Sequence, residues 1–437
     1  MRFLLPCLLA LTISPALFAE ETTEDWQARF QSTYIWQQSS GFSAAYSGQN
    51  SLSDQRESGY TFTATAFLGA RPWRGGEVYM NVEVGQGAPL SGLTGLGGFT
   101  NGEATKVSGK QLKGYLQRLF LRQTWNLGGE SEYLASDFNR MAGFVDKNRI
   151  VLTAGNFSTL DVFDGNAYAK DPRTQFLNWS NMAHTAFDYA ADARGFGWGF
   201  AGEWYQDDWV LRFGRMTGPK EPNGETLDFQ LLKHFGDQVE LEHAHQIAGQ
   251  PGKVRLLAWR NRAVLATFND ASAWYVSHPG GNPQAIFDVR NGAQIKYGVG
   301  INIEQAINDD LGFFLRAMRA DGRTETYAFT EADGSFATGL QLKGSAWARA
   351  GDTLGLSWMR NTISTDRRNY LSLGAISYFI GDGGLNYHPE SILETYYSLK
   401  VINGLWLAAD YQRIANPAYN ADRGPANIGS LRVHAEF

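Results

Sequence analysis

The feature that most constrains the fold is a recurring alternation of polar and apolar side chains in segments of about ten residues. A strand of ~9 to 11 residues, tilted as in a barrel, is long enough to cross a membrane. In the segment 76–87 one face is apolar and the other mostly polar, the residues being Val78, Met80, Val82 and Val84 against Glu77, Tyr79, Asn81 and Glu83. Beyond residue 19, no stretch approaches the ~18 uninterrupted apolar residues of a membrane-spanning helix. Any membrane crossing would therefore be made by strands.

The last nine residues, 429–437, alternate in the same way and end on Phe437. This pattern is typical of the closing strand of an outer-membrane β-barrel, with one face toward lipid and the other toward a wet lumen. We expect Leu431, Val433 and Ala435 to face lipid, and Arg432, His434 and Glu436 to face the lumen. Taken alone, these residues would also fit the edge strand of a secreted β-sandwich.

Residues 1–19 have the features of a secretory signal peptide: Arg2, an apolar run from Phe3 to Phe18, and Ala19 before Glu20. Leu17 fits the usual cleavage pattern poorly, so the cut is expected at Ala19 or a residue or two away. The predicted organisation is a signal peptide over 1–19 and one barrel domain over 20–437. The expected location is the outer membrane of a Gram-negative cell.

Eighteen strand-like segments can be distinguished. Short turns such as 206–208, 236–237, 308–310, 350–352 and 403–404 would lie at one end of the barrel, and long loops such as 39–59, 88–114, 157–194, 248–294 and 361–391 at the other. On that arrangement the segments 253–263 and 370–379 break the up-and-down order. Assigning both to loops, and keeping 226–236 as a strand, predicts an all-β transmembrane antiparallel barrel of sixteen strands, with eighteen as the alternative.

Several blocks resemble the carbohydrate-selective porin family of Gram-negative outer membranes, the OprB type. They run in family order from about residue 115 and comprise 161–168 (DVFDGNAY), 171–179 (DPRTQFLNW), 188–195, 321–326 (DGRTET), 380–387 (IGDGGLNY), 416–425 (NPAYNADRGP) and 432–437. The resemblance implies a sixteen-stranded barrel that passes sugars and related small polyhydroxylated solutes by passive diffusion, through a pore narrowed by inward loops. It leaves open which solute is preferred.

The long loop 157–194 is the candidate to fold into the channel. Carboxylates and guanidiniums can bind sugar hydroxyls, and aromatic faces can stack on sugar rings. The candidate residues in this loop are Asp161, Asp164, Tyr168, Asp171, Arg173, Trp179, Asp188, Asp192 and Arg194. The same charges would also fit a purely structural role, in which they tie the loop to the barrel wall.

On the predicted strands, Arg118 and Arg122 share one face and are expected to point into the lumen. Further lumen candidates are Arg316, Arg349, Arg360, Glu240, Glu242 and Glu394. His243 and His245 also share a strand face, but no third ligand is evident. We therefore predict neither a metal nor a cofactor.

The sequence leaves two other functions open: an outer-membrane barrel hydrolase, and a surface barrel that binds or assembles polysaccharide. The seven histidines show no grouping that suggests a hydrolase, so no enzyme activity is expected. The net charge of −6 argues against a nucleic-acid partner. Expected partners are small carbohydrates, outer-membrane lipid and the barrel-assembly machinery, which would engage the strand ending at Phe437. Porin-like barrels are often homotrimers, and the sequence leaves the oligomeric state open.

Overall fold

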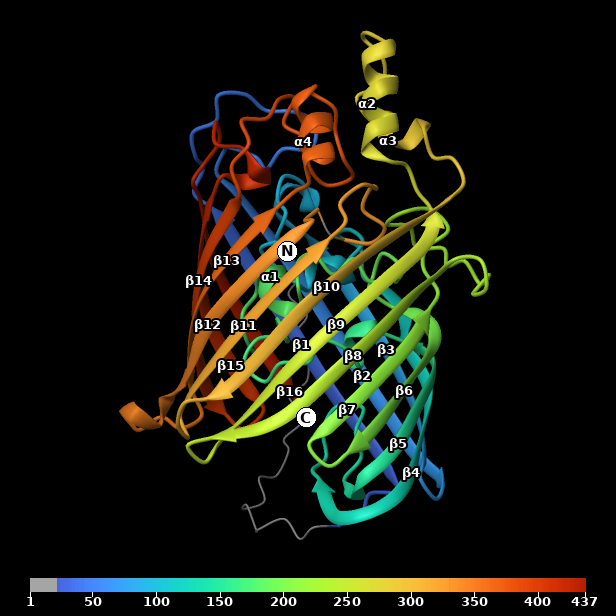
Figure 1. Cartoon of the computed structure of the whole chain (residues 1–437). Helices are drawn as coiled ribbons and strands as arrows, with labels where there is room; N and C mark the ends of the chain where they lie inside the picture. The colour runs from blue at the N-terminus through green and yellow to red at the C-terminus, as the bar shows by residue number, and fades with distance from the viewer. Residues whose placement is uncertain (1–21, 330) are drawn as a thin grey trace.

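The computed structural model describes residues 22–329 and 331–437, so the predicted signal peptide lies outside the described residues. Sixteen strands of this described part form one closed antiparallel barrel, in which each strand pairs with its sequence neighbours and β1 pairs with β16 (Figure 1). The sixteen-stranded fold predicted from the alternation is confirmed.

The strands are β1 (Trp26–Ser39), β2 (Glu57–Trp73), β3 (Gly76–Ala88), β4 (Lys113–Leu134), β5 (Gly143–Phe157), β6 (Gly197–Gln206), β7 (Trp209–Met216), β8 (Phe235–Ile247), β9 (Gln250–Val264), β10 (Ala293–Ala306), β11 (Leu311–Ala320), β12 (Gly334–Lys343), β13 (Thr353–Thr362), β14 (Glu390–Ile402), β15 (Leu405–Ala415) and β16 (Ala426–Glu436). The α-helices are α1 (Trp179–Met182), α2 (Phe268–Ser277), α3 (Ala285–Asp288) and α4 (Thr365–Ser372). Short 3-10 helices are η1 (Leu90–Leu93), η2 (Ala104–Lys106), η3 (Thr159–Asp161), η4 (Gly344–Trp347) and η5 (Pro417–Tyr419).

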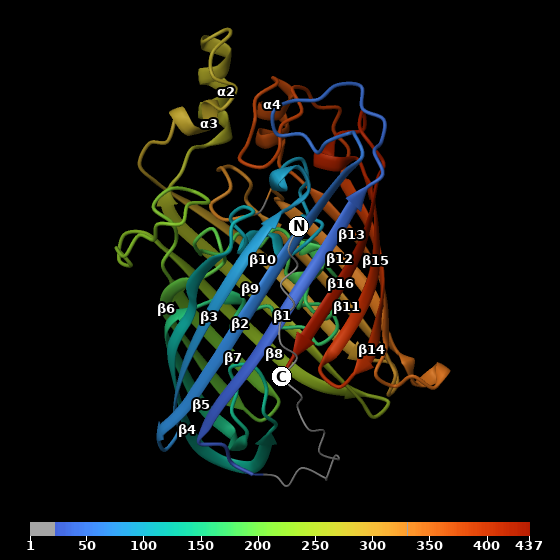
Figure 2. The same cartoon turned by 180° about the vertical axis from the view of Figure 1, so that it is seen from behind.

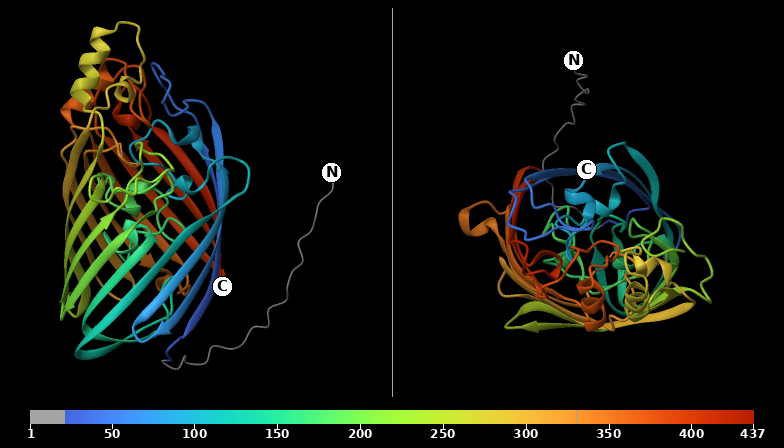
Figure 3. Two further views of the ribbon diagram at one scale, coloured as in Figure 1. Left: turned by 90° about the vertical axis from the view of Figure 1, so that its right-hand side faces the viewer. Right: turned by 90° about the horizontal axis from the view of Figure 1, so that it is seen from above.

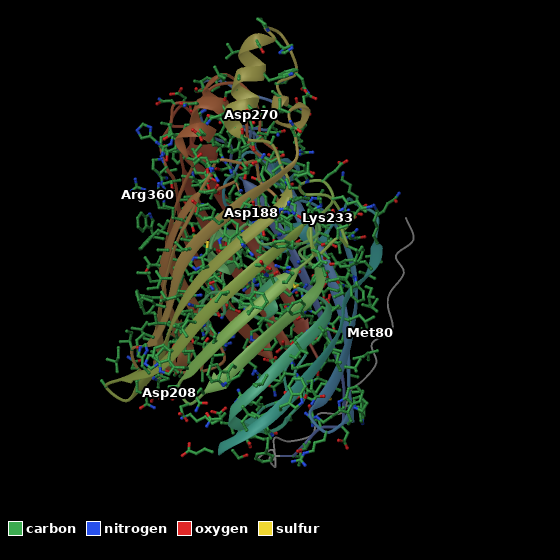
Figure 4. All side chains as sticks on the ribbon, turned by 45° about the vertical axis from the view of Figure 1, so that its right-hand side comes forward. Met80, Asp188, Asp208, Lys233, Asp270 and Arg360 are labelled. Carbon is green, nitrogen blue, oxygen red and sulfur yellow. The ribbon has the colours of Figure 1, made fainter. Side chains whose placement is uncertain are left out.

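The two faces of the wall follow the alternation of the sequence. On β16, Leu431 and Val433 are 56% and 40% exposed, whereas Arg432 and His434 are 4% and 1% exposed. Because the barrel has an apolar outer surface and a polar inner one, it suits a lipid environment. Met80 lies on this outer surface (Figure 4). Within the described residues, no helix is long and apolar enough to span a membrane.

The short turns and long loops lie at opposite ends of the barrel. Long loops and the helices α2, α3 and α4 gather at one end, and Asp208, in the turn between β6 and β7, marks the other (Figures 1, 2 and 4). In barrels of this kind the long loops are extracellular and the short turns periplasmic. Exposed tryptophans near the turn end form an aromatic girdle: Trp26, Trp73, Trp125, Trp204 and Trp209.

One of the two segments predicted to be loop is a strand. Residues 253–263 form most of β9, whereas 226–236 lies almost wholly in the connection between β7 and β8. The predicted loop 248–294 is therefore too long, and the predicted turn at 236–237 is wrong because both residues belong to β8. The second segment, 370–379, is not a strand, as predicted: it lies in the connection between β13 and β14, and its first three residues end α4. The strand count was correct because the two errors cancel.

Two arginines predicted to face the lumen do not. Arg360 is exposed on the outer face of β13, because Ser357, Met359 and Asn361 take the inward positions (Figure 4). Arg349 lies beyond the end of β12, in the turn before β13, where its side chain is 48% exposed and pairs with Asp352. Arg316, Glu240, Glu242 and Glu394 are buried on the inner side of the wall, as predicted.

Candidate functional site

The connection between β5 and β6, residues 158–196 and here called the inner loop, fills much of the barrel interior. Its residues contact inward-facing side chains on opposite parts of the wall, from Arg118 on β4 and Arg316 on β11 to Glu394 on β14 and Arg432 on β16. A segment with contacts on all these strands must cross the lumen. Seen from above, loop segments occupy the inside of the ring of strands (Figure 3).

Asp164 anchors the inner loop to the wall. Its carboxylate lies 3.1 Å from Nε of Arg316 and 2.5 Å from the side-chain amide of Asn302, and it accepts a hydrogen bond from the backbone N–H of His184. Burial lowers the pKa of His184 to about 4, so the ring is neutral at pH 7. Asp164 thus holds the inner loop against β10 and β11, and it is not among the residues that line the cavity described below.

Asp188 makes a second anchor, in the interior of the barrel toward its extracellular end (Figure 4). The carboxylate is fully buried, 2.7 Å from the Lys296 ammonium on β10. It also accepts hydrogen bonds from the backbone N–H groups of Tyr327 and Ala328, in the connection between β11 and β12. One side chain thus ties the inner loop to a strand and to an outer loop.

The two aromatic candidates pack in the interior. Trp179, in α1, is 2% exposed and packs against Phe329 and Phe99. The Tyr168 ring lies so close to the wall at Gly312 that a Cβ there would come within 2.0 Å of it. A glycine at this point of β11 lets the loop approach the wall. Neither Tyr168 nor Trp179 belongs to the lining of the cavity described below.

The end of the inner loop is a tight turn around Asp192. Its carboxylate accepts hydrogen bonds from the backbone N–H groups of Arg194 and Phe196, and burial raises its pKa. Arg194 stacks over the Tyr115 ring, pairs with Glu225, and its carbonyl accepts a hydrogen bond from the Lys106 ammonium. Asp192 and Arg194, both predicted as site residues, thus make the contacts that hold this turn in place.

A second inward loop, residues 89–112 between β3 and β4, was predicted only as an outer loop. Its Leu96 and Phe99 are buried, and its backbone pairs with the inner loop through Trp179 N–H to Phe99 O. Arg173 of the inner loop joins the two loops and the wall. Its guanidinium lies 2.8 Å from Glu83 on β3 and 2.8 Å from Glu103 of the second loop.

A cavity of 1510 Å³ opens beneath the inner loop and reaches the turn end of the barrel. Asp161, Lys170 and Arg173 of the inner loop line it from one side, and Arg74 and Gly75 of the β2–β3 turn from the other. Eleven lining residues are Lys or Arg and six are Asp or Glu, so the lining is strongly polar and carries net positive charge. The connection between β4 and β5 also folds against the cavity, where Phe138 packs on Phe67 of β2.

Arg118 and Asp161 form a bidentate ion pair in the lining of this cavity, with Nε and Nη2 2.7 and 2.6 Å from the two carboxylate oxygens. A bulge at Gln117 shifts the phase of β4, so that Gln117 and Arg118 both point inward and bond to each other. Burial opposes ionisation of Asp161, but the charge of Arg118 outweighs it and lowers the pKa of the carboxyl group.

Arg122, four residues further along β4 than Arg118, also lines the cavity. It donates to the carbonyl of Asn139, lies 3.6 Å from Glu77 and stacks over the Tyr79 ring. Asp171 lies in the lining close to Arg173, whose backbone N–H donates to its carboxylate. Arg118 and Arg122 thus face the lumen, as predicted.

The predicted site thus divides into two groups. Five residues line the cavity: Arg118, Arg122, Asp161, Asp171 and Arg173. Six lie away from the lining and hold the inner loop: Asp164, Tyr168, Trp179, Asp188, Asp192 and Arg194.

Sequence reasoning missed a ladder of charges on the inner faces of β6, β7, β8, β9 and β10. Arg212 lies within 3.1 Å of Glu203, Glu240 and Glu242, and Arg255 bridges Glu242 to Glu304. The alternation along β8 indicates Glu240 and Glu242, but Arg255, which pairs with Glu242, lies in a segment predicted to be a loop. Within residues 22–329 and 331–437, no group of three or more His, Cys, Asp or Glu side chains is placed to hold a metal ion.

Comparison with known proteins agrees with this architecture. The family described as "Carbohydrate-selective porin, OprB family" matches residues 60–437. The high-pH structure of Pseudomonas putida OprB is similar, with a TM-score of 0.70 and 16% identity over 94% of each chain. The outer membrane channel DcaP of Acinetobacter baumannii is similar with a TM-score of 0.51 and 9% identity, over 94% of this chain and 97% of that one. No curated protein sequence matches significantly.

Proposed function

The chain belongs to the carbohydrate-selective porin, OprB family, and we propose that sugars cross the outer membrane through the cavity beneath its inner loop. The family and the barrel fold make the protein an outer-membrane porin for sugars, and they point to a channel rather than an enzyme. The observation that supports this path is the cavity with its charged lining, which extends from the inner loop to the periplasmic turns.

In this proposal the inner loop is the constriction, and its lining residues contact the solute. Arg118, Arg122 and Arg173 offer planar arrays of N–H donors, and Asp161 and Asp171 offer carboxylate acceptors. Sugar hydroxyls both donate and accept, so such a lining can replace part of their hydration as they pass. The transport is passive and uses neither cofactor nor covalent chemistry.

The remaining predicted residues serve this pore indirectly. Asp164 and Asp188 fix the loop to β11 and β10, and Asp192 shapes its final turn. A loop held at several points keeps the lining in one geometry, which a selective pore requires.

The protein would reach the outer membrane by secretion followed by assisted assembly. A signal peptide ending near Ala19 would be removed during secretion. The assembly machinery would then engage the strand that ends at Phe437, and the mature barrels would associate as homotrimers.

Replacing Arg118 with alanine is expected to weaken sugar binding in the pore about tenfold, because a charge-assisted donor pair contributes ~1.5 to 3 kcal/mol. The measurement is the concentration of monosaccharide that half-blocks the current of single channels in planar bilayers. Arg140→Ala is the matched control, since Arg140 lines the same cavity near its turn end and pairs with Asp137 at 3.3 Å. Unchanged block in Arg118→Ala would place the selective contacts elsewhere.

A further inference from the structure

An ion-paired cluster lies on the outer surface of the wall, at the extracellular ends of β7, β8 and β9. Arg215 is paired in register with Asp237, and Asp237 with Arg260. The Asp237 carboxylate lies 2.7 Å from Nε of Arg215 and 3.0 Å from Nη2 of Arg260. One carboxylate is thus shared by two guanidiniums, and the Arg260 side chain is still 55% exposed.

Two further cations extend this cluster. Arg262, two residues along β9 from Arg260, donates to the backbone carbonyl of Lys233. The Lys233 side chain is exposed at the outer wall, below the projecting helix α2 that carries Asp270 (Figure 4). The outer-wall cluster, defined as Arg215, Lys233, Asp237, Arg260 and Arg262, therefore holds four cationic side chains and one carboxylate.

Apolar side chains surround the cluster. Phe213 on β7 and Val239 on β8 are the next outward residues toward the periplasm, and they are 42% and 43% exposed. Phe229 and Leu232, in the connection that carries Lys233, are 66% and 88% exposed. Net positive charge thus stands at the extracellular edge of a lipid-facing apolar surface.

We propose that the outer-wall cluster binds the phosphate of an anionic lipid in the outer leaflet. Charged side chains are tolerated near the membrane interface but not at its centre, so the cluster belongs at headgroup depth. Arginine recognises phosphate through paired N–H donors, and basic residues near an anionic lipid surface are attracted to it. Phe229 and Leu232 would insert beside the acyl chains of the same lipid, because this contact removes their exposed apolar side chains from water.

The test is native mass spectrometry of the purified full-length barrel in detergent, titrated with lipid A that carries two phosphates. The same lipid without phosphates should bind clearly more weakly. Arg215→Gln/Asp237→Asn/Arg260→Gln removes the three paired charges together and leaves no carboxylate unpaired. It is expected to weaken binding about tenfold, and Lys233→Glu, on an exposed loop, about fivefold.

The matched control is Arg360→Gln, an outward-facing arginine whose register partners on β12 and β14 are Phe336 and Ser391. It should bind lipid A like the wild type. Millimolar inorganic phosphate should not displace the lipid, because acyl contacts contribute to the affinity. Equal binding of the dephosphorylated lipid, or unchanged binding by Lys233→Glu, would overturn the proposal. So would a change in oligomeric mass without loss of lipid, which would make the surface a contact between barrels.

Discussion

Arg316→Ala is expected to detach the inner loop from β11 and to raise the conductance of the pore while abolishing its discrimination among sugars. The Arg316 side chain is 1% exposed, and it bonds to Asp164 and to the backbone carbonyls of Ala169 and Asn181. Its removal leaves the Asp164 carboxylate buried without its main counter-charge, which costs about 3 to 5 kcal/mol. Loops open locally at a lower free energy than the strands of the wall unfold. The loop should therefore move while the wall stays folded.

Single-channel recording in planar bilayers checks this prediction, with heat-modifiable gel migration as the test of barrel folding. Arg349→Ala is the control, because the half-exposed Arg349 side chain pairs with Asp352 in the turn between β12 and β13, outside the inner loop. Arg316→Lys keeps the positive charge but lacks the planar guanidinium group. Its conductance should lie between those of the wild type and Arg316→Ala. A folded Arg316→Ala barrel with normal conductance and normal sugar block would show that the anchor is dispensable.

Arg173→Ala should change the ion selectivity of the pore and weaken its binding of sugar. Arg173 is the shared counter-ion of Glu83 and Glu103, whose side chains are 0% and 4% exposed. Without it the two carboxylates face each other, which destabilises the junction of the two inward loops by about 3 to 5 kcal/mol. The lining also loses one positive charge, so the channel should become more permeable to cations.

Reversal potentials in a potassium chloride gradient measure that shift. Glu103→Gln removes the opposite charge from the same junction and should move the reversal potential the other way. The double variant Arg173→Ala/Glu103→Gln should lie close to the wild type. Shifts in the same direction from both single variants would mean that Arg173 acts through loop position rather than through its charge.

The wall of the barrel could be predicted from sequence because alternation reports directly which face of a strand meets lipid. The strand assignment failed at 226–236, predicted as a strand, and at 253–263, predicted as a loop, because only one of the two could be kept in the up-and-down order. The pair Gly236–Asp237 resembles a turn, but Gly236 lies within β8, where a Cβ would come within 2.5 Å of the Cβ of Ala190 in the inner loop. Its glycine serves loop packing, and Asp237 is held outward by Arg215 and Arg260. Neither reason is visible in the local sequence.

The loop that fills the lumen could also be predicted, but the roles of its residues could not. Asp161 and Asp164 are three positions apart and chemically alike. Asp161 meets Arg118 on β4 and lines the cavity, whereas Asp164 meets Arg316 on β11 and is buried. Their partners come from distant strands, so only the path of the loop across the barrel separates a lining carboxylate from an anchoring one.

Conductance of the purified protein in planar bilayers, with and without monosaccharides, tests most directly whether this barrel is an open sugar pore. Stepwise openings that added sugar reduces in a saturable way are the expected result. A barrel that inserts but stays closed, or one whose current no sugar reduces, would contradict it.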